Sequence, residues 1–261
     1  MDKLIVIKIG GQIIDDPEKL STFLKKFAAV PSAKILVHGG GKLATQMAAQ
    51  LNIPQQMTEG RRITDAETLK VVTMVYAGLI NKNIVAQLQS LGTNAIGLSG
   101  ADGNVILAHK RINPQTDFGF VGDIDQVNTG FLKSMLQQGL VPVMAPITHD
   151  GKGQMLNTNA DTIAQEIARA MSNDFEVELV YSFEKKGVML DLNDESTVIH
   201  QLDASSYLEL KNTGKIFAGM IPKLDNAFAA LQHGVKKVII GKAEEMDELL
   251  TGQHGTHISN G

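Results

Sequence analysis

Lysines that stand beside glycines are the residues of this chain best suited to chemistry on an anion. Lys8 lies near the end of an apolar run and is followed closely by Gly10 and Gly11. A lysine in an apolar strand is costly unless its ammonium group emerges at the strand end, and glycine lets backbone N–H groups approach a phosphate. The segment therefore indicates a phosphate-binding turn, although a surface lysine beside an ordinary turn explains these residues equally well.

A second glycine-rich turn occupies residues 38–42, His-Gly-Gly-Gly-Lys, between an apolar run and a helical pattern. The amides of Gly40 and Gly41, with the positive end of the helix dipole, form an anion site. Together with Ala44 the run also fits the glycine spacing of dinucleotide-binding proteins, which leaves an NAD-dependent oxidoreductase open. It does not fit the P-loop of ATPases, because Leu43 stands where a magnesium-binding Ser or Thr is required.

Three further segments carry side chains suited to a bound substrate. Residues 60–62, Gly-Arg-Arg, offer the guanidinium group of Arg62 to a carboxylate. Residues 157–161, Asn-Thr-Asn-Ala-Asp, open a helix, and residues 219–223, Gly-Met-Ile-Pro-Lys, place Lys223 just inside another. Each segment has an ordinary explanation, as a solvated ion pair, a helix cap or a proline at a helix start. None of them decides the function alone.

Six short apolar runs rich in Val and Ile are the elements that must position these side chains. Apolar strands separated by helical patterns are typical of a parallel sheet covered on both faces, and ligands bind such sheets at the carboxyl ends of their strands. We therefore predict an α/β fold, an open three-layer αβα sandwich with a mostly parallel central sheet. The predicted strands are 4–9, 35–37, 95–98, 141–144, 177–181 and 238–240.

Capping and turn signals add detail to this prediction. A capping box at residues 64–67 opens a long proline-free helix that reaches about Leu91. Asp102-Gly103 and Asp150-Gly151 predict tight turns, and so hairpins on the rim of the sheet. The polar stretch at residues 171–174 predicts a boundary between two lobes.

Composition limits the functions that are open to the chain. Its 261 residues, 43% of them hydrophobic, can fill a large core, and a net charge of -4 gives no overall attraction to nucleic acid or an acidic membrane. The absence of cysteine excludes disulfides and zinc-thiolate sites and fits the cytoplasm. The seven histidines show no metal-ligand spacing, so we predict no metal site made of protein side chains. No apolar run approaches the about 18 to 20 residues of a membrane span.

Six segments, in their order along the chain, resemble the amino-acid kinase superfamily and, within it, the N-acetylglutamate kinases of arginine biosynthesis. They are KIGG at 8–11, HGGGK at 38–42, GRR at 60–62, FVGDI at 120–124, NTNAD at 157–161 and GMIPK at 219–223. The resemblance extends to residues 255–258. It implies that ATP, bound with Mg²⁺, gives its γ-phosphoryl group to the side-chain carboxylate of N-acetyl-L-glutamate. Such a carboxylate is already ionised at pH 7, so the reaction needs no general base.

The resemblance also implies roles for individual residues and for the two lobes. The implied catalytic residues are Lys8, Gly11, Asp161 and Lys223, with the aspartate orienting the two lysines. The implied substrate-binding residues are Gly40, Gly41, Arg62 and Asn157. The implied nucleotide-binding residues are Lys8, Gly10, Gly11, Ser182, Gly187 and Lys223. The lobe of residues 1–172 would bind the amino acid and form the dimer, and the lobe of residues 173–261 would bind ATP.

Two features depart from the family pattern. Phe183 stands where many relatives carry an aspartate, in the turn at residues 181–188; this changes the expected ATP contacts and not the reaction. The chain also begins only seven residues before Lys8, without the N-terminal helix through which arginine-inhibited hexamers assemble. We therefore expect a homodimer that arginine does not inhibit.

Several alternatives stay open at this point. An N-succinylglutamate kinase differs only in the acyl group of its substrate, and the sequence does not give the size of the pocket for that group. A carbamate or aspartate kinase belongs to the same superfamily. An inactive regulatory relative would keep the fold, although the intact lysines argue against it.

Overall fold

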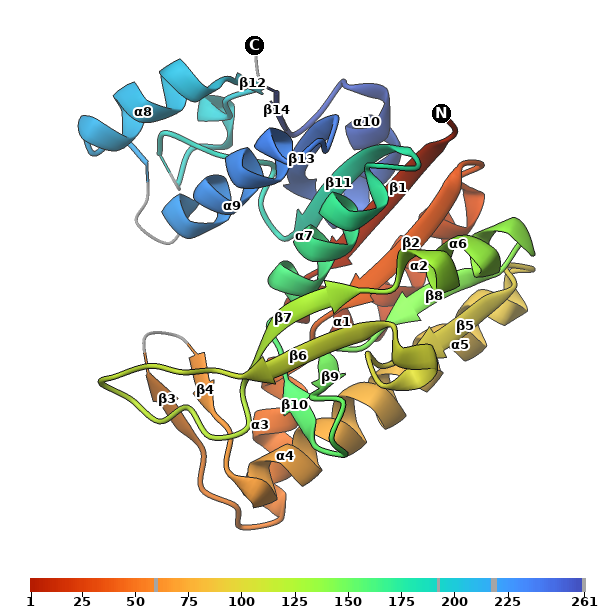
Figure 1. Cartoon of the computed structure of the whole chain (residues 1–261). Coiled ribbons are helices and arrows are strands. Elements are labelled where there is room, and N and C mark those ends of the chain that lie inside the picture. The colour runs from red at the N-terminus through yellow and green to blue at the C-terminus, as the bar shows by residue number, and fades with distance from the viewer. Residues whose placement is uncertain (59–60, 192, 217–219, 260–261) are drawn as a thin grey trace.

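An eight-stranded sheet forms the centre of the protein in the computed structural model, which describes residues 1–58, 61–191, 193–216 and 220–259 (Figure 1). Its strand order is β12-β14-β13-β11-β1-β2-β8-β5, and all six predicted runs are strands of this sheet. Neighbouring strands are parallel except for β13 and β14, so the sheet is mixed and mostly parallel. The strands of the protein are β1 (Lys3–Ile9), β2 (Ala33–His38), β3 (Gln56–Thr58), β4 (Arg61–Ile63), β5 (Ala95–Leu98), β6 (Ile106–Lys110), β7 (Gly122–Val127), β8 (Val141–Met144), β9 (Ile147–His149), β10 (Met155–Asn157), β11 (Glu176–Phe183), β12 (Gln201–Leu202), β13 (Lys237–Lys242) and β14 (Thr256–Ile258).

Helices cover both faces of the central sheet. Along β1, Leu4 and Val6 belong to one core with side chains of α6, α7 and α9, whereas Ile5 and Ile7 belong to a second core with α2, α3, α4, α5 and α10. The alternation follows from the two-residue period of a strand. The predicted three-layer αβα sandwich is confirmed. The helices are α1 (Gly11–Ile14), α2 (Pro17–Ala29), α3 (Gly41–Gln50), α4 (Ala66–Thr73), α5 (Asn81–Ser90), α6 (Thr129–Gln137), α7 (Ala160–Met171), α8 (Ala204–Asn212), α9 (Ile221–Gln232) and α10 (Met246–Thr251).

Smaller sheets form a rim on one side of the central sheet (Figure 1), one of four strands in the order β10-β9-β6-β7 and one made of β3 and β4. The hairpin predicted at Asp150-Gly151 is confirmed, because it joins β9 to the antiparallel β10. The hairpin predicted at Asp102-Gly103 is wrong. These residues form a short 3-10 turn from β5 to β6, which lie in different sheets. Every residue of β5 is paired in parallel with β8, so the chain leaves the central sheet here and does not turn back along it.

The long helix predicted after residue 64 is present and covers residues 66–90 as α4, a π-helical segment (Met74–Ile80) and α5. Its cap is Asp65, whose carboxylate accepts the N–H group three residues later at 2.7 Å. The predicted capping box is therefore wrong by one residue. The backbone of Thr64 is instead bonded to the neighbouring segment 118–120, which holds it outside the helix.

By length and composition this helix is long and apolar enough to cross a membrane, contrary to the prediction that no segment approaches the length of a membrane span. Its side chains Val72, Ile84 and Leu88 are nevertheless fully buried in the core formed with the central sheet. This arrangement is that of a core helix in a globular protein.

The predicted boundary between the lobes falls between Met171, where α7 ends, and Glu176, where β11 begins. The central sheet continues across the boundary, because β11 pairs with β1 along seven residue pairs. Both halves of the chain are thus built on one sheet. The division into a substrate lobe and a nucleotide lobe stays a prediction.

Candidate active site

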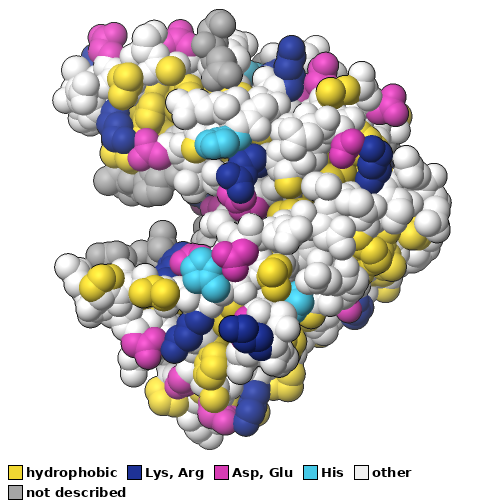
Figure 2. Space-filling view, in the orientation of Figure 1, with side chains coloured by type: hydrophobic (Ala, Val, Ile, Leu, Met, Phe, Trp, Pro, Cys, Tyr) yellow, Lys and Arg dark blue, Asp and Glu magenta, His cyan; other side chains and the backbone are white. Residues whose placement is uncertain are grey.

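A cavity of about 590 Å³ opens at the carboxyl ends of β1 and β2, the edge at which an open α/β sheet binds its ligands. Its walls come from the rim strands and from the starts of α3, α7 and α9. Figure 2 shows the molecule hollowed between the C-terminal helices and the rim hairpins. The lining residues are Lys8, Gly11, Gly39, Gly40, Gly41, Met57, Arg62, Tyr76, Arg111, Val121, Pro146, Asn157, Thr158, Asn159, Ala160, Asp161, Thr162, Lys223 and Asn226.

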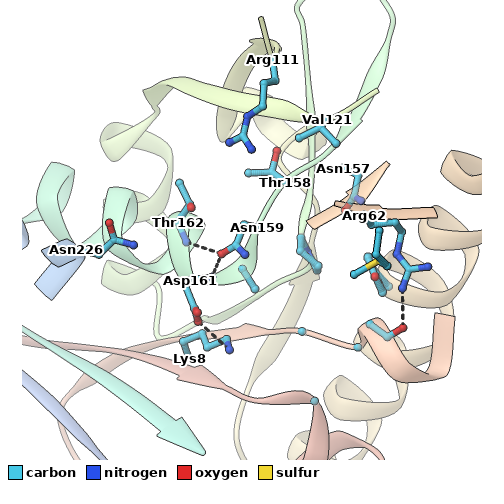
Figure 3. Close-up of a pocket in the computed structure, with 18 of the residues that line it drawn as sticks. Lys8, Arg62, Arg111, Val121, Asn157, Thr158, Asn159, Asp161, Thr162 and Asn226 are labelled. Carbon is cyan, nitrogen blue, oxygen red and sulfur yellow. Dashed lines mark hydrogen bonds and ion pairs between the residues drawn. The ribbon is translucent and has the colours of Figure 1, made fainter. Parts of the chain in front are cut away.

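Lys8, Asp161 and Lys223 form an ion cluster in this cavity. One carboxylate oxygen of Asp161 lies 2.8 Å from Lys8 Nζ, and the other lies 2.6 Å from Lys223 Nζ. Figure 3 shows Lys8 and Asp161 facing each other. Burial opposes the charged carboxylate, but the two ammonium groups hold the pKa of Asp161 at about 2. Two positive groups thus share one negative group, and the surplus positive charge attracts an anion into the cavity.

Local structure explains why these three charges converge. Lys8 is fixed near the end of β1, which is paired on both sides. Asp161 lies in the first turn of α7, where a negative charge is favoured by the helix dipole. Asn159 caps that helix by accepting the N–H groups of Asp161 and Thr162 at 2.8 and 3.1 Å. Lys223 lies in the first turn of α9, which packs against α7.

The predicted glycines shape the backbone around this cluster. The Gly10 N–H group donates to the carbonyl of Ser182 at 3.0 Å, which ties the end of β1 to β11. Gly11 lines the cavity, and apart from its chain neighbours and its own helix no described heavy atom lies within 4 Å of the position that a Cβ would take. Gly40 has a φ of +145°, a conformation that side chains rarely adopt, and Gly41 begins α3 beside it. The structure therefore brings both glycine turns to the lysine cluster.

Arg62 and Asn157 lie together on another wall of the cavity (Figure 3). The guanidinium group of Arg62 donates to the carbonyl of Gly41 at 2.9 Å, to the hydroxyl of Thr45 at 2.8 Å and to the side-chain oxygen of Gln55. These bonds hold the arginine beside the glycine turn. The site therefore presents a cationic part and a part rich in hydrogen-bonding groups.

Three of the predicted nucleotide residues, Gly10, Ser182 and Gly187, are buried and lie outside the set of described residues that line the cavity. Gly187 packs so closely on β14 that an added Cβ would lie 2.6 Å from the hydroxyl oxygen of Thr256. Ser182 lies near the end of β11 and Gly187 in the segment after it. The role of the three residues toward a nucleotide stays a prediction. Gly60 and Gly219, of the GRR and GMIPK segments, lie outside the described residues.

Arg111 also lines the cavity and points toward Thr158 in Figure 3, although it belongs to none of the motifs in the sequence that predicted site residues. Its Nε lies 3.1 Å from both carboxylate oxygens of Asp123, and its guanidinium carbon lies 5.7 Å from the centre of the Phe118 ring. Asp123 belongs to the FVGDI segment, but it faces the arginine only through the pairing of β6 with β7. The sequence contains both residues, but it does not show which residues of β6 and β7 lie opposite each other. Tyr76, Asn159 and Asn226 also line the cavity and were not predicted as site residues.

Known proteins match this chain over nearly its whole length. The model of the amino acid kinase family matches residues 3–242. An acetylglutamate kinase of Cytophaga hutchinsonii is 58% identical over 251 residues, which cover 96% of this chain and 95% of that protein. Among solved structures, smu.665 from Streptococcus mutans UA159 has a TM-score of 0.80 at 28% identity and covers 99% of both chains. A carbamate kinase of Giardia, with a TM-score of 0.71 at 12% identity over 99% of this chain and 98% of that one, shares the fold.

These matches confirm the family and the fold that the ordered segments predicted. The family match includes residues 38–42, so the interpretation of that glycine run as part of an NAD-dependent oxidoreductase is wrong. The chain belongs to the amino acid kinase family, within its group of acetylglutamate kinases.

Proposed function

We propose that this protein transfers the γ-phosphoryl group of ATP to the side-chain carboxylate of N-acetyl-L-glutamate, as an acetylglutamate kinase of arginine biosynthesis. The observation that carries the proposal is the ion cluster in which Asp161 lies between Lys8 and Lys223 beside two glycine turns. Such a cluster concentrates positive charge where two anionic substrates must meet. The name of a relative that is 58% identical supports this substrate.

The reaction requires charge neutralisation and alignment. A carboxylate oxygen of the acceptor bonds to the γ-phosphorus, while the bond from that phosphorus to the β,γ-bridging oxygen breaks and ADP leaves with the electron pair. Lys8 and Lys223 neutralise the charge that develops on the transferring group. Asp161, whose pKa is about 2, stays ionised at assay pH and keeps the two ammonium groups together.

We assign the two substrates to different parts of the cavity. Arg62 and Asn157 bind the α-carboxylate and the acyl group of the amino acid, because a guanidinium group grips a carboxylate with two hydrogen bonds. Gly40 and Gly41 line the same cavity as this wall and the ion cluster, and we assign their amides to the anion that binds there. The ATP phosphates extend from Gly11 toward the C-terminal lobe, past Ser182 near the end of β11 and the segment after it that contains Gly187.

Mg²⁺ is assigned to the phosphates of ATP. Within the described residues, no group of three or more His, Asp or Glu side chains could hold a metal ion. The cavity carboxylate, Asp161, is already shared by two lysines. The cavity therefore fits a Mg²⁺ ion that is bound by the phosphate oxygens of ATP, where it would help to neutralise their negative charge.

A hydroxylamine trap tests the proposed reaction. Purified protein is incubated with MgATP, hydroxylamine and N-acetylglutamate, N-succinylglutamate or aspartate, and ADP release is measured in parallel, with carbamate as a further acceptor. An acyl phosphate is captured as a hydroxamate. We expect hydroxamate with acetylglutamate, and the absence of signal with every acylglutamate would refute the proposal.

Arg111 favours N-succinylglutamate as a second candidate substrate. Its side chain is only 17% exposed, and it adds a second guanidinium group to the cavity beside Val121 and Asn157. A succinyl group ends in a carboxylate that this arginine can bind, whereas an acetyl group offers it no charge. If succinylglutamate is the substrate, Arg111→Met will raise its KM at least tenfold and leave the KM of acetylglutamate within twofold. Equal effects on both would exclude this role.

We further propose that the enzyme is a cytoplasmic homodimer. Met74 and Leu79, on the π-helical segment, are large apolar side chains that are more than half exposed, which favours burial against a second copy. The absence of cysteine fits a reducing compartment. Light scattering coupled to gel filtration measures the mass directly, and a monomer at micromolar concentration contradicts the proposal. Insensitivity to arginine stays a prediction.

A further inference from the structure

The glycine turn at the cavity is held from behind by a buried histidine and asparagine that the proposed reaction does not use. His38, at the end of β2, is fully buried; its Nδ1 lies 2.8 Å from the carbonyl oxygen of Gly39, and its Nε2 lies 3.1 Å from Asn81 Nδ2. Asn81 also donates to the carbonyl of Val143 at 2.9 Å. Its side chain fills a space left by Gly97, where an added Cβ would lie 1.9 Å from the amide oxygen.

These contacts fix the proton of the imidazole on Nδ1. The Gly39 carbonyl can only accept, so Nδ1 must donate to it. Lys82 Nζ lies 3.1 Å from the side-chain oxygen of Asn81, which sets the orientation of that amide and leaves its N–H group facing Nε2 of His38. A second proton on the ring would face this donor, so the network excludes the imidazolium form. Burial agrees with this, since it lowers the pKa of His38 to about 4.

The bond from His38 also sets the direction of the next amide. In a trans peptide unit the C=O and N–H groups point in opposite directions. Because the Gly39 carbonyl is held against the buried imidazole, the N–H group of Gly40 points the other way. Gly39, Gly40 and Gly41 line the cavity, whereas the buried His38 is not among the described residues that line it.

The π-helical segment Met74–Ile80 packs against the same turn. An added Cβ on Gly40 would lie 2.2 Å from Ile80 Cδ1 and 3.3 Å from the ring of Tyr76. A π-helix bonds residues five apart, and the Asn81 N–H group donates to the carbonyl of Tyr76. Asn81 and Tyr76 therefore lie on one face, whereas in an α-helix residues five apart lie on different faces. The wider turn therefore lets one helix both pack on Gly40 and bind His38.

We propose that His38 and Asn81 are positioning residues that aim the Gly40 N–H group at the anion in the cavity, and that the π-helical segment brings Asn81 to this task. The inference rests on the proposed function, because it takes the anion to be a partner in phosphoryl transfer. The expected contribution is that of one aimed backbone donor, about 100-fold in kcat.

Two substitutions of His38 separate positioning from packing. His38→Asn places an amide donor near the Nδ1 position, where it can still bind the Gly39 carbonyl, whereas His38→Gln places its amide near Nε2. Positioning predicts a fall in kcat of about tenfold or less for His38→Asn and about 100-fold for His38→Gln, with smaller changes in both KM values. A packing role predicts the opposite order, because Asn leaves the larger cavity. That opposite order would overturn the proposal.

A matched pair on the helix gives a second test. Asn81→Asp keeps the size of the side chain and removes the donor that faces Nε2. Asn83→Asp adds the same charge two residues later, at an exposed position. We expect kcat to fall at least tenfold in the first variant and to stay within about twofold in the second. If the two variants behave alike, Asn81 has no special role.

Imidazole ¹⁵N NMR of the unmodified chain needs neither a folded variant nor a known substrate. His38, assigned among the seven histidines by isotope-edited contacts to Gly39, is expected to be neutral and protonated on Nδ1 between about pH 5 and 8. A charged ring or an Nε2–H tautomer at neutral pH would overturn the proposal. This result is separate from the hydroxamate assay, which alone decides the proposed function.

Discussion

Two lysines on neighbouring strands, Lys8 and Lys34, are both largely buried and have opposite roles. Lys8 lies at the carboxyl end of β1, shares the carboxylate of Asp161 with another ammonium group and lines the cavity. Lys34 lies at the amino end of β2, at the opposite edge of the sheet. Its ammonium group donates to three backbone carbonyls at the end of α2, at 2.7 to 2.8 Å: those of Phe27, Ala28 and Val30.

The difference shows that burial of a lysine does not by itself indicate chemistry. The last carbonyls of a helix lack partners within the helix. Lys34 satisfies such carbonyls with all three of its N–H groups, so none is left for a ligand. Lys8 and Lys223 together face a single carboxylate, so part of their charge remains available to an anion. The edge of the sheet and the partners of the ammonium group separate a catalytic lysine from a structural one.

The largest expected effect is that of Lys8→Arg. A guanidinium group keeps the charge but cannot occupy the position of the ammonium group, so stabilisation of the transition state is lost. We expect kcat to fall about 1000-fold with KM values within a few-fold, measured by steady-state kinetics. Lys3→Arg, at an exposed position on the same strand, is the control. A large rise in KM at unchanged kcat would show that Lys8 serves only in binding.

Asp161→Asn is expected to lower kcat about 100-fold, because the two ammonium groups then repel each other and move apart. The folded pKa of about 2 lies below the ordinary value of 3.8. The stabilisation from this carboxylate is therefore present above about pH 4 and is lost as the pH falls toward 2. Urea unfolding at pH 5 and pH 3 should show this loss in the unmodified protein. An equal loss in the variant would assign it to other groups.

Lys34→Met tests the other side of the comparison. Three buried carbonyls lose their donor, so the free energy of unfolding should fall by about 2 to 4 kcal/mol. Urea unfolding measures this change, and kcat at a temperature where the variant is folded should stay within twofold. A fall in kcat comparable to that of Lys8→Arg would break the distinction between the two lysines.

The smallest expected effect is that of Arg62→His, which weakens one wall of the cavity and leaves the ion cluster intact. The KM of the acylglutamate should rise about tenfold or more, since a bidentate contact to carboxylate is lost. The KM of ATP should stay within about twofold. Initial rates with each substrate varied in turn provide both values, and equal effects on the two would refute the placement of Arg62.

Much of the fold could be predicted because the strand signals are local. The predicted strands at 95–98 and 141–144 match β5 and β8 residue for residue, and the helix predicted to open at residues 157–161 is α7 (Ala160–Met171). The hairpin predicted at Asp102-Gly103 failed because the turn itself is local but the pairing of the strands on either side is not. A turn signal cannot tell whether the next strand joins the same sheet.

The sequence by itself determined which chemical groups stand at the ends of strands and helices. Since parallel strands end at one edge, this was enough to bring Lys8 and Gly40 to one site. Asp161, which follows β10 of the rim sheet, was added to that site by the family resemblance. Only the tertiary structure decided that Lys34 caps a helix, that Arg111 reaches the cavity and that a π-helical turn supports the glycine run. These roles depend on contacts between segments far apart in the chain, which form by packing and leave no periodic pattern in the sequence.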